Sequence, residues 1–256
     1  MIHPTALVDP GARIGSNVSI GPFSIIEADV EVGDGTSIGS HVVIGSNTRI
    51  GRDNRIWQFA SIGAAPQDKK FHGERSRLEI GDRNVIREFV TFNRGTEDGG
   101  GLTRIGNDNW LMAYVHIAHD CTVGNNTIFS NAASLAGHVS VDDWVILGGF
   151  TLVHQFCEVG SHAFTAMGAI INRDVPPYVT VAGYRAEPHG INSEGLRRRG
   201  FDAEEIAAIK RAYKLLYMSD LKLAEAVERM RELVAACPRV APLLDFVADS
   251  PRGIVR

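Results

Sequence analysis

The sequence predicts an all-β solenoid, a parallel β-helix with triangular coils, followed by a C-terminal α-helical domain. Large apolar residues recur at every sixth position, glycine often follows them, and near residue 190 this pattern gives way to helical spacing. A period of six fits neither an α-helix nor an ordinary strand. It is typical of short strands that each point one apolar side chain inward and are separated by tight corners.

The six-residue repeat begins at Ile2 and reaches Ile171 with two interruptions. Its inward positions share large apolar side chains, with Thr165 as the exception: Ile2, Val8, Ile14, Ile20, Ile26, Val32, Ile38, Ile44, Ile50, Ile56, Ile62, Ile80, Ile86, Phe92, Ile105, Leu111, Ile117, Val123, Phe129, Leu135, Val141, Leu147, Val153, Val159 and Ile171. Three faces make a coil of 18 residues. Residues 18 apart should therefore stack in neighbouring coils, about 4.8 Å apart.

Two stretches inside the predicted solenoid, residues 1–190, leave the repeat. At 64–79 the repeat would bury Asp68, so this stretch is predicted to loop out. The stretch 93–104 contains three consecutive glycines and shifts the phase by one residue, which predicts a second, flexible loop. Loops on a rigid scaffold often carry binding groups.

The C-terminal segment, residues 191–256, has helical spacing. Asp202 followed by Glu205 resembles a capping box at the start of a helix, and Pro238 ends a second amphipathic stretch. A third short helix is predicted over 242–249. This domain is expected to cap the solenoid, because an uncapped coil exposes apolar surface and unpaired strand edges.

Composition excludes several classes of protein. The 256 residues carry a formal net charge of -4 with a pI near 6.1, which argues against general nucleic-acid binding. The three cysteines have no close pairing and are expected to be reduced thiols in the cytoplasm. No apolar run is long enough for membrane insertion, and no signal peptide is expected because the repeat begins at Ile2.

The stacking rule gathers polar residues that are far apart in the sequence. His119, Gly137 and Gln155 differ by 18 each and are predicted to form one column on three successive coils. Asp120 and His138 belong to the adjacent column. A histidine, a glycine N–H and an amide side chain suit proton transfer and stabilisation of an oxyanion.

Two other interpretations of this polar cluster remain open. The side chains could be solvated groups on outward faces, or stacked histidines could bind zinc between subunits. Because the column of His119 continues with glycine and glutamine rather than histidine, we expect no metal.

Five motifs resemble the UDP-N-acetylglucosamine O-acyltransferases of lipid A biosynthesis: IAHDCTVG, LAGHVSVDDW, LVHQFCEVG, NRDVPPYVTVAG and NSEGLRRRGF. The resemblance extends from MIHPTALVDPGARIG to PRGIVR. It implies a left-handed parallel β-helix, a homotrimer with sites between subunits, and no cofactor. It also implies that a 3-hydroxyacyl chain passes from acyl carrier protein to the glucosamine 3-position of UDP-N-acetylglucosamine, the first step of lipid A biosynthesis.

The same resemblance implies roles for individual residues. His119 would be the general base, Asp120 its orienting carboxylate, and Gly137 the backbone donor to the thioester oxyanion. The residues implied to position the sugar, the nucleotide or the acyl carrier are Asp68, Lys70, His116, His138, His154, Gln155, Asn192, Glu194 and Arg198. Direct attack by the sugar would need no cysteine nucleophile, so a ternary complex is favoured over an acyl-enzyme.

Two positions depart from the family pattern. Asn93, in FNRGT, stands where the best-known members have histidine, which leaves open whether the acceptor carries a 3-hydroxyl or a 3-amino group. Met167 stands where long-chain members have glycine. A methionine there would fill the end of the acyl cleft, which predicts a chain of about ten carbons.

Other functions stay open at this stage. A zinc-dependent, carbonic-anhydrase-like enzyme would hold stoichiometric zinc. A non-catalytic solenoid that docks a carrier would not cleave the thioester of that carrier. Another hexapeptide acyltransferase would use a CoA donor. A basic cluster, Arg197–Arg199 with Lys210 and Arg211, favours an acidic carrier protein instead.

Overall fold

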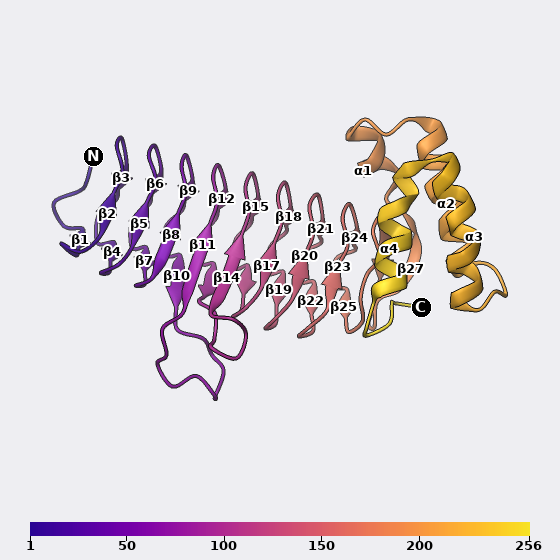
Figure 1. The fold of residues 1–256 in the computed structure, drawn as a ribbon. Coiled ribbons are helices and arrows are strands. Elements are labelled where there is room, and N and C mark those ends of the chain that lie inside the picture. Colours follow the sequence, from indigo (N-terminus) through magenta and orange to yellow (C-terminus); the bar gives the residue numbers. More distant parts are fainter.

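Each turn of the solenoid consists of three short strands, most of them two residues long, and the computed structural model describes all of residues 1–256. In strands such as Ser19–Ile20 and Ser37–Ile38 the second residue is buried in the core, whereas the first points outward. Strands of successive turns pair in parallel, and the molecule is a left-handed parallel β-helix with a helical cap (Figure 1), as predicted.

The strands form three sheets, which we call A, B and C. Sheet A pairs, in spatial order, β27 (Glu187–Ile191), β26 (Val179–Ala182), β24 (Phe164–Thr165), β21 (Ile146–Leu147), β18 (Ile128–Phe129), β15 (Trp110–Leu111), β12 (Val85–Ile86), β9 (Arg55–Ile56), β6 (Ser37–Ile38) and β3 (Ser19–Ile20). Sheet B pairs β1 (Leu7–Val8), β4 (Ile25–Ile26), β7 (Val43–Ile44), β10 (Ser61–Ala64), β13 (Thr91–Asn93), β16 (His116–Ile117), β19 (Ser134–Leu135), β22 (Leu152–Val153) and β25 (Ile170–Ile171). Sheet C pairs β2 (Arg13–Ile14), β5 (Glu31–Val32), β8 (Thr48–Ile50), β11 (Arg77–Ile80), β14 (Leu102–Ile105), β17 (Thr122–Val123), β20 (Ser140–Val141) and β23 (Glu158–Val159).

The strand register follows the 18-residue coil except where the chain loops out. Ile20 pairs with Ile38 on the next turn of sheet A, but Ile50 pairs with Ile80 in sheet C, and Ile80 pairs with Ile105. The extra residues leave the coil as two loops, 65–76 and 94–101, which project from the same side of the solenoid (Figure 1). Both loops connect a strand of sheet B to the next strand of sheet C, at what we call the B–C corner.

The corners use left-handed backbone conformations at non-glycine residues. Asp120, His138 and Phe156, on successive turns of the B–C corner, have φ of 60°, 62° and 64°. Buried polar side chains satisfy backbone groups at another corner: the Asn84 amide donates to Asn54 Oδ1 at 2.9 Å, and Asn84 Nδ2 donates to Gly106 O at 2.9 Å. Because each corner repeats the same geometry, side chains 18 residues apart stack.

The C-terminal end of the solenoid differs from the expected run of coils up to residue 190. After β25, β26 pairs in parallel with β24 and turns back as an antiparallel hairpin with β27. Buried Asp174 ties the chain end to the last coil, since its Oδ2 accepts a hydrogen bond from Ser250 Oγ at 2.7 Å and its backbone bridges to Ile254.

The helical cap comprises α1 (Ser193–Arg198), α2 (Ala203–Tyr217), α3 (Leu223–Ala236), a 3₁₀ turn (Pro238–Val240) and α4 (Ala241–Asp249). The expected capping box at the start of α2 is present: Asp202 accepts a hydrogen bond from the Glu205 amide, and Glu205 accepts one from the Asp202 amide. None of the four α-helices combines the length and apolar character that a membrane span requires.

Candidate active site

A cavity of about 770 Å³ lies at the B–C corner, below the two loops. It is lined by loop residues and by histidines of later coils: Gln67, Asp68, Lys69, Lys70, Asn93, Thr96, Asp98, His116, Ala118, His119, His138, Gln155 and Phe156. The cavity lies here because the two loops leave the B–C corner after β10 and β13. These strands belong to the two turns that precede the turn carrying β16 and His119.

The predicted column of His119, Gly137 and Gln155 is present. A Cβ added to Gly137 would lie only 2.6 Å from His119 Cε1, so glycine is what allows the imidazole to lie against the next coil. His138 N donates to His119 O at 3.0 Å across the same step. The Gly137 N–H has no hydrogen-bond partner within the chain and remains available to a ligand.

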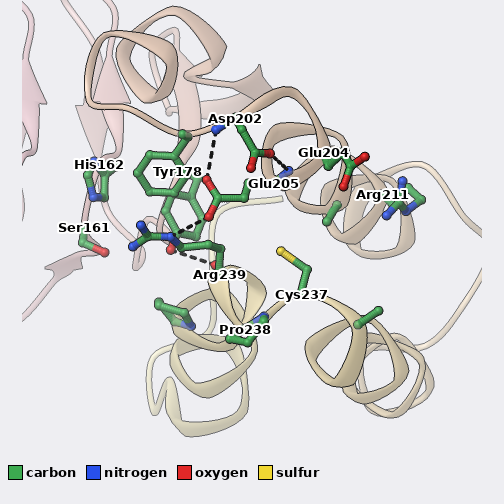
Figure 2. A pocket seen from close by; sticks show the side chains of 14 residues that line it. Ser161, His162, Tyr178, Asp202, Glu204, Glu205, Arg211, Cys237, Pro238 and Arg239 are labelled. Atoms are coloured by element: carbon green, nitrogen blue, oxygen red, sulfur yellow. Dashed lines mark hydrogen bonds and ion pairs between the residues drawn. The ribbon is translucent and has the colours of Figure 1, made fainter.

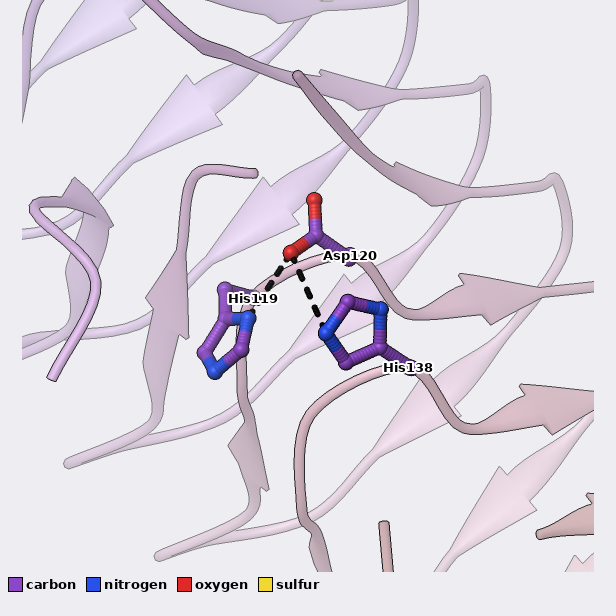
Figure 3. Close-up of side chains that lie close together, drawn as sticks. All are labelled: His119, Asp120 and His138. Carbon is purple, nitrogen blue, oxygen red and sulfur yellow. Dashed lines mark hydrogen bonds and ion pairs between the residues drawn. The ribbon is translucent and has the colours of Figure 1, made fainter. Parts of the chain in front are cut away.

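His119 and Asp120 form a hydrogen-bonded dyad (Figure 3). His119 Nδ1 lies 2.8 Å from Asp120 Oδ2, and the Asp120 side chain is only 1% exposed. Because a carboxylate accepts, Nδ1 carries the proton and Nε2 is left with a free lone pair. The pair therefore has the geometry of a base held by its orienting carboxylate.

Two further histidines lie near the dyad: His116 in β16, on the same turn, and His138 at the B–C corner of the next turn. The His138 ring meets the His119 ring edge-on with centroids 5.1 Å apart, and its Nε2 lies 3.8 Å from Asp120 Oδ2. His116 Nδ1 lies 2.7 Å from Thr91 Oγ1. Burial lowers the pKa of His116, so this ring is neutral near pH 7 and can act as a hydrogen-bonding group rather than a cation.

The first loop brings opposite charges to the mouth of this cavity. Asp68 and Lys70 both line it, and the Lys70 amide donates to Asp68 Oδ1 at 3.0 Å. A carboxylate and an ammonium group on one loop suit a ligand that carries both hydroxyl and phosphate groups.

Several predicted site residues do not reach this cavity within one chain. His154 is exposed, with Nδ1 3.1 Å from Gln155 O. Asn192 caps α1 by accepting from the Gly195 amide at 3.1 Å, and Glu194 pairs with Arg198 at 3.0 Å. The last three side chains lie at the helical end of the molecule, whereas His154 follows β22 on the solenoid.

The proposed acyl ruler is placed as expected along the coil but is not packed. A Cβ added to Gly149 would lie 3.9 Å from Met167 Cγ and 3.5 Å from Asn131 O, so the three residues share a column. However, Met167 is 79% exposed in the single chain. The side chain lies at the corner between sheets A and B, and its role as an acyl ruler stays a prediction.

The basic cluster is also weaker than its sequence indicates. Arg197 and Arg198 pair with Glu194 on the same helix, and Arg199 lies over the Trp144 ring with its guanidinium 5.2 Å from the centroid. Lys210 and Arg211 remain exposed on α2. Local pairing thus removes much of the positive field that a carrier would meet.

Sequence reasoning missed the contribution of the second loop. Thr96 N and Oγ1 donate to the Asp120 carboxylate at 2.8 and 2.6 Å, so this loop is held in place rather than free as expected. Asn93 is buried and its Oδ1 has no hydrogen-bond partner. The triple glycine was the available signal, since glycine also marks close approach of backbone to another group.

A second cavity, of about 750 Å³, lies where the helical cap meets the last coils (Figure 2). Its side chains are occupied with each other: Glu205 accepts from Arg239 at 3.0 Å, and the Arg239 guanidinium lies over Phe201. Burial, with Arg199 and Arg239 nearby, lowers the pKa of His162 to about 4. This cavity is a joint between domains and lacks a base paired with a carboxylate.

The dyad region has some of the features of a metal site. Ligand atoms of His119, Asp120 and His138 all lie within 4.8 Å of one another. Two of these atoms are already joined by the His119–Asp120 hydrogen bond, and Asp120 Oδ2 also accepts from Thr96. The donor set is therefore used internally, although a zinc ion could compete with the proton on His119.

Two family models match the chain. Residues 174–255 match the second domain of UDP-N-acetylglucosamine O-acyltransferase, and residues 11–46, 29–64 and 102–137 match the bacterial transferase hexapeptide repeat.

Relatives match over the full chain. An acyl-[acyl-carrier-protein]–UDP-N-acetylglucosamine O-acyltransferase from Thiobacillus denitrificans is 62% identical, with 100% of this chain and 99% of the relative covered. A protein of the same name from Janthinobacterium is 60% identical, with 100% and 99% covered.

Solved structures agree with these matches. The UDP-N-acetylglucosamine acyltransferase of Francisella novicida superposes with a TM-score of 0.97 at 46% identity, covering 100% of this chain and 94% of that one. The acyltransferase of Bacteroides fragilis superposes with a TM-score of 0.98 at 44% identity, covering 100% of both chains.

Proposed function

The chain belongs to the family of UDP-N-acetylglucosamine O-acyltransferases, and from this membership we propose that His119 and Asp120 catalyse acyl transfer from acyl carrier protein to UDP-N-acetylglucosamine. The reaction would be the first step of lipid A biosynthesis. One observation carries the assignment to this site: a buried carboxylate orients a histidine that lines the cavity, and Gly137, which lies against that histidine, has an N–H with no hydrogen-bond partner in the chain.

The residues divide the chemistry between them. The unprotonated Nε2 of His119 accepts the proton of the sugar hydroxyl as its oxygen attacks the thioester carbonyl carbon. Asp120 stabilises the imidazolium that forms, and the Gly137 N–H donates to the oxyanion. When the tetrahedral intermediate collapses, the C–S bond breaks and the carrier thiolate takes the proton from His119.

The positioning roles follow from placement around the cavity. Asp68 and Lys70 are proposed to hold the sugar and phosphates from the first loop, and His116, His138 and Gln155, which also line the cavity, are proposed to position the substrate. The acceptor is proposed to carry a 3-hydroxyl, in keeping with an O-acyltransferase. Asn93 lines the cavity, and its buried Oδ1 has no hydrogen-bond partner within the chain.

A homotrimer is proposed because several assigned residues lie outside the cavity of one chain. We propose that His154, Asn192, Glu194 and Arg198 contribute to the site of a neighbouring subunit. The outward side of sheet B supports such contact, since Leu7 and Leu152 are 66% and 45% exposed. Light scattering should give about three times the 27.8 kDa of one chain, and a monomer would refute this assignment. We place the enzyme in the cytoplasm, in keeping with its free thiols.

The acyl chain is proposed to have about ten carbons, because Met167 would narrow the cleft once a neighbouring subunit covers it. Mass spectrometry of the product from UDP-N-acetylglucosamine and a mixed pool of 3-hydroxyacyl carriers tests both acceptor and chain. Met167→Gly should shift the product towards about fourteen carbons. Equal use of both lengths by the wild type would remove the ruler role from Met167.

The rival zinc function rests on the proximity of His119, Asp120 and His138. Acyl transfer as written needs no metal. Stoichiometric zinc in the purified protein, together with loss of acyl transfer after chelation, would favour the rival. Unchanged acyl transfer after chelation would favour the dyad.

A further inference from the structure

The Asp120 carboxylate receives three hydrogen bonds, and two come from one residue of another coil. Thr96 N donates to Oδ1 at 2.8 Å and Thr96 Oγ1 donates to Oδ2 at 2.6 Å. The third donor is His119 Nδ1, at 2.8 Å from Oδ2. A carboxylate that is 1% exposed needs such donors, because burying an unpaired charge is costly.

Thr96 lies on a short glycine-rich segment, residues 95–101, which we call the strap. A Cβ added to Gly95 would lie 2.7 Å from Asp120 Oδ1, and one added to Gly99 would overlap the carboxylate itself. The strap closes around Thr96, since Gly101 N donates to Thr96 O at 2.7 Å. Its glycines therefore allow the backbone to lie directly on Asp120.

The placement of the Thr96 hydroxyl has a chemical consequence. It donates to Oδ2, the same oxygen that accepts from His119. It therefore fixes the rotation of the carboxylate about its Cβ–Cγ bond, while the Asp120 amide is anchored by Thr103 Oγ1 at 2.8 Å. Without the hydroxyl, the carboxylate keeps its charge but loses one restraint on the oxygen that aligns the imidazole.

We propose that Thr96 is a positioning residue for acyl transfer, acting through Asp120 to hold the His119 imidazole towards the acceptor hydroxyl. The inference rests on the proposed role of His119 as the base. It also gives the second loop a part in catalysis, through its hydrogen bonds to Asp120.

Thr96→Val tests this role because it keeps the side-chain shape and the backbone donor and removes only the hydroxyl. We expect kcat to fall about tenfold while KM for both substrates stays within about twofold, since a transition-state interaction is lost. Thr96→Ser should restore most of kcat. Thr96→Ala carries the same expectation as Thr96→Val if the valine variant does not fold.

Thr127→Val is the matched control. Thr127 is also a buried threonine, and its hydroxyl donates to Asn109 Oδ1 at 2.7 Å at the corner between sheets C and A, not at the B–C corner that carries the dyad. This variant should lower the melting temperature and leave kcat unchanged. A loss of kcat equal to that of Thr96→Val would show that any buried threonine matters, and would overturn the inference.

A double-mutant cycle separates positioning from general structure. In an Asp120→Ala background, Thr96→Val should cause no further loss of kcat, because the group through which it acts is gone. A further loss of about tenfold there, or normal kcat in Thr96→Val alone, overturns the role of Thr96 and leaves the proposed function standing. Full activity of the Asp120→Ala single variant would instead overturn the proposed function, and this inference with it.

Discussion

Two corners of the solenoid share one backbone conformation and differ in what they carry. At the corner between sheets A and B, Phe59, Phe89 and Tyr114 have φ of 63°, 59° and 66°, and their rings stack at centroid distances of 5.1 and 5.0 Å. At the B–C corner, Asp120 and His138 have φ of 60° and 62°, yet one is a buried carboxylate and the other borders a cavity.

The difference arises where the chain leaves its period. The A–B corner repeats without insertion, so like side chains continue from coil to coil as an aromatic ladder: Phe23, His41, Phe59, Phe89 and Tyr114. At the B–C corner the loop 94–101 takes the place of the stacked neighbour that Asp120 would otherwise have on the preceding coil, while His138 follows on the next coil. The regular coil thus supplies rigidity, and the interruptions supply a cavity and a shielded carboxylate.

Of the substitutions considered, His119→Ala at the B–C corner should cause the largest loss of activity. Loss of a general base typically lowers the rate by about 10²–10⁴-fold. The side chain lies outside the core, so the melting temperature should stay close to that of the wild type. Acyl transfer is measured with saturating donor and acceptor, and circular dichroism monitors the fold. More than about a tenth of wild-type activity would mean that another residue is the base.

Gly99→Ala should disrupt the close contact between the strap and the Asp120 carboxylate. The added methyl group would overlap the Asp120 carboxylate, so the strap or the carboxylate must move. A displacement of about 1 Å at a catalytic group costs up to about 10²-fold in kcat, and we expect a loss approaching this size.

Gly100→Ala is the control for this substitution. Gly100 has a φ of +90° and nothing within 4 Å of an added Cβ, so alanine there strains the backbone without touching Asp120. If Gly100→Ala reduces kcat as much as Gly99→Ala, flexibility of the strap matters and its contact with the carboxylate does not.

The sequence predicts the solenoid well because every coil obeys the same constraint. The inward residues from Ile20 to Ile171 are buried as the repeat requires. Thr165, the polar exception, is also tolerated at an inward position, because its Oγ1 lies within hydrogen-bond distance of Thr151 Oγ1, at 2.7 Å, inside the core. The stacking of His119 on Gly137 follows from the same rule. The full-length relatives confirm the family resemblance.

The sequence could not predict contacts that break the repeat. Thr96 reaches Asp120 across 24 positions, and no periodicity relates a loop to the coil it covers. The hairpin of β26 and β27 was missed for a similar reason, since it begins after the repeat has ended at Ile171. His154 and His138 were both predicted to position the substrate, but His154 is exposed whereas His138 lines the cavity.

At the aromatic ladder, Phe59→Ala should affect stability and not chemistry. Phe59 stacks with His41 at 5.2 Å and Phe89 at 5.1 Å, so truncation removes two aromatic contacts worth about 0.5–1.5 kcal/mol each. The free energy of unfolding should fall by about 1–3 kcal/mol while kcat stays within about twofold of wild type. A loss of kcat without loss of stability would mean that the two corners are functionally coupled.

The smallest effect is expected from Cys121→Ser, next to the dyad. An acyl-enzyme would need a reactive thiolate, but the Cys121 side chain is fully buried and its Sγ donates to Ala136 O at 3.1 Å. Burial raises the pKa of this thiol to about 12, so it is protonated at any pH where the enzyme works. Serine keeps a hydrogen-bond donor at this position, and kcat should change by less than about twofold if the sugar hydroxyl attacks the thioester directly.

Cys157→Ser is the parallel control, since burial raises the pKa of that thiol to about 11 and it lies farther from His119 along the same corner. A loss of two or more orders of magnitude in Cys121→Ser alone, with a covalent acyl adduct on the wild-type chain by mass spectrometry, would replace direct attack with a two-step mechanism.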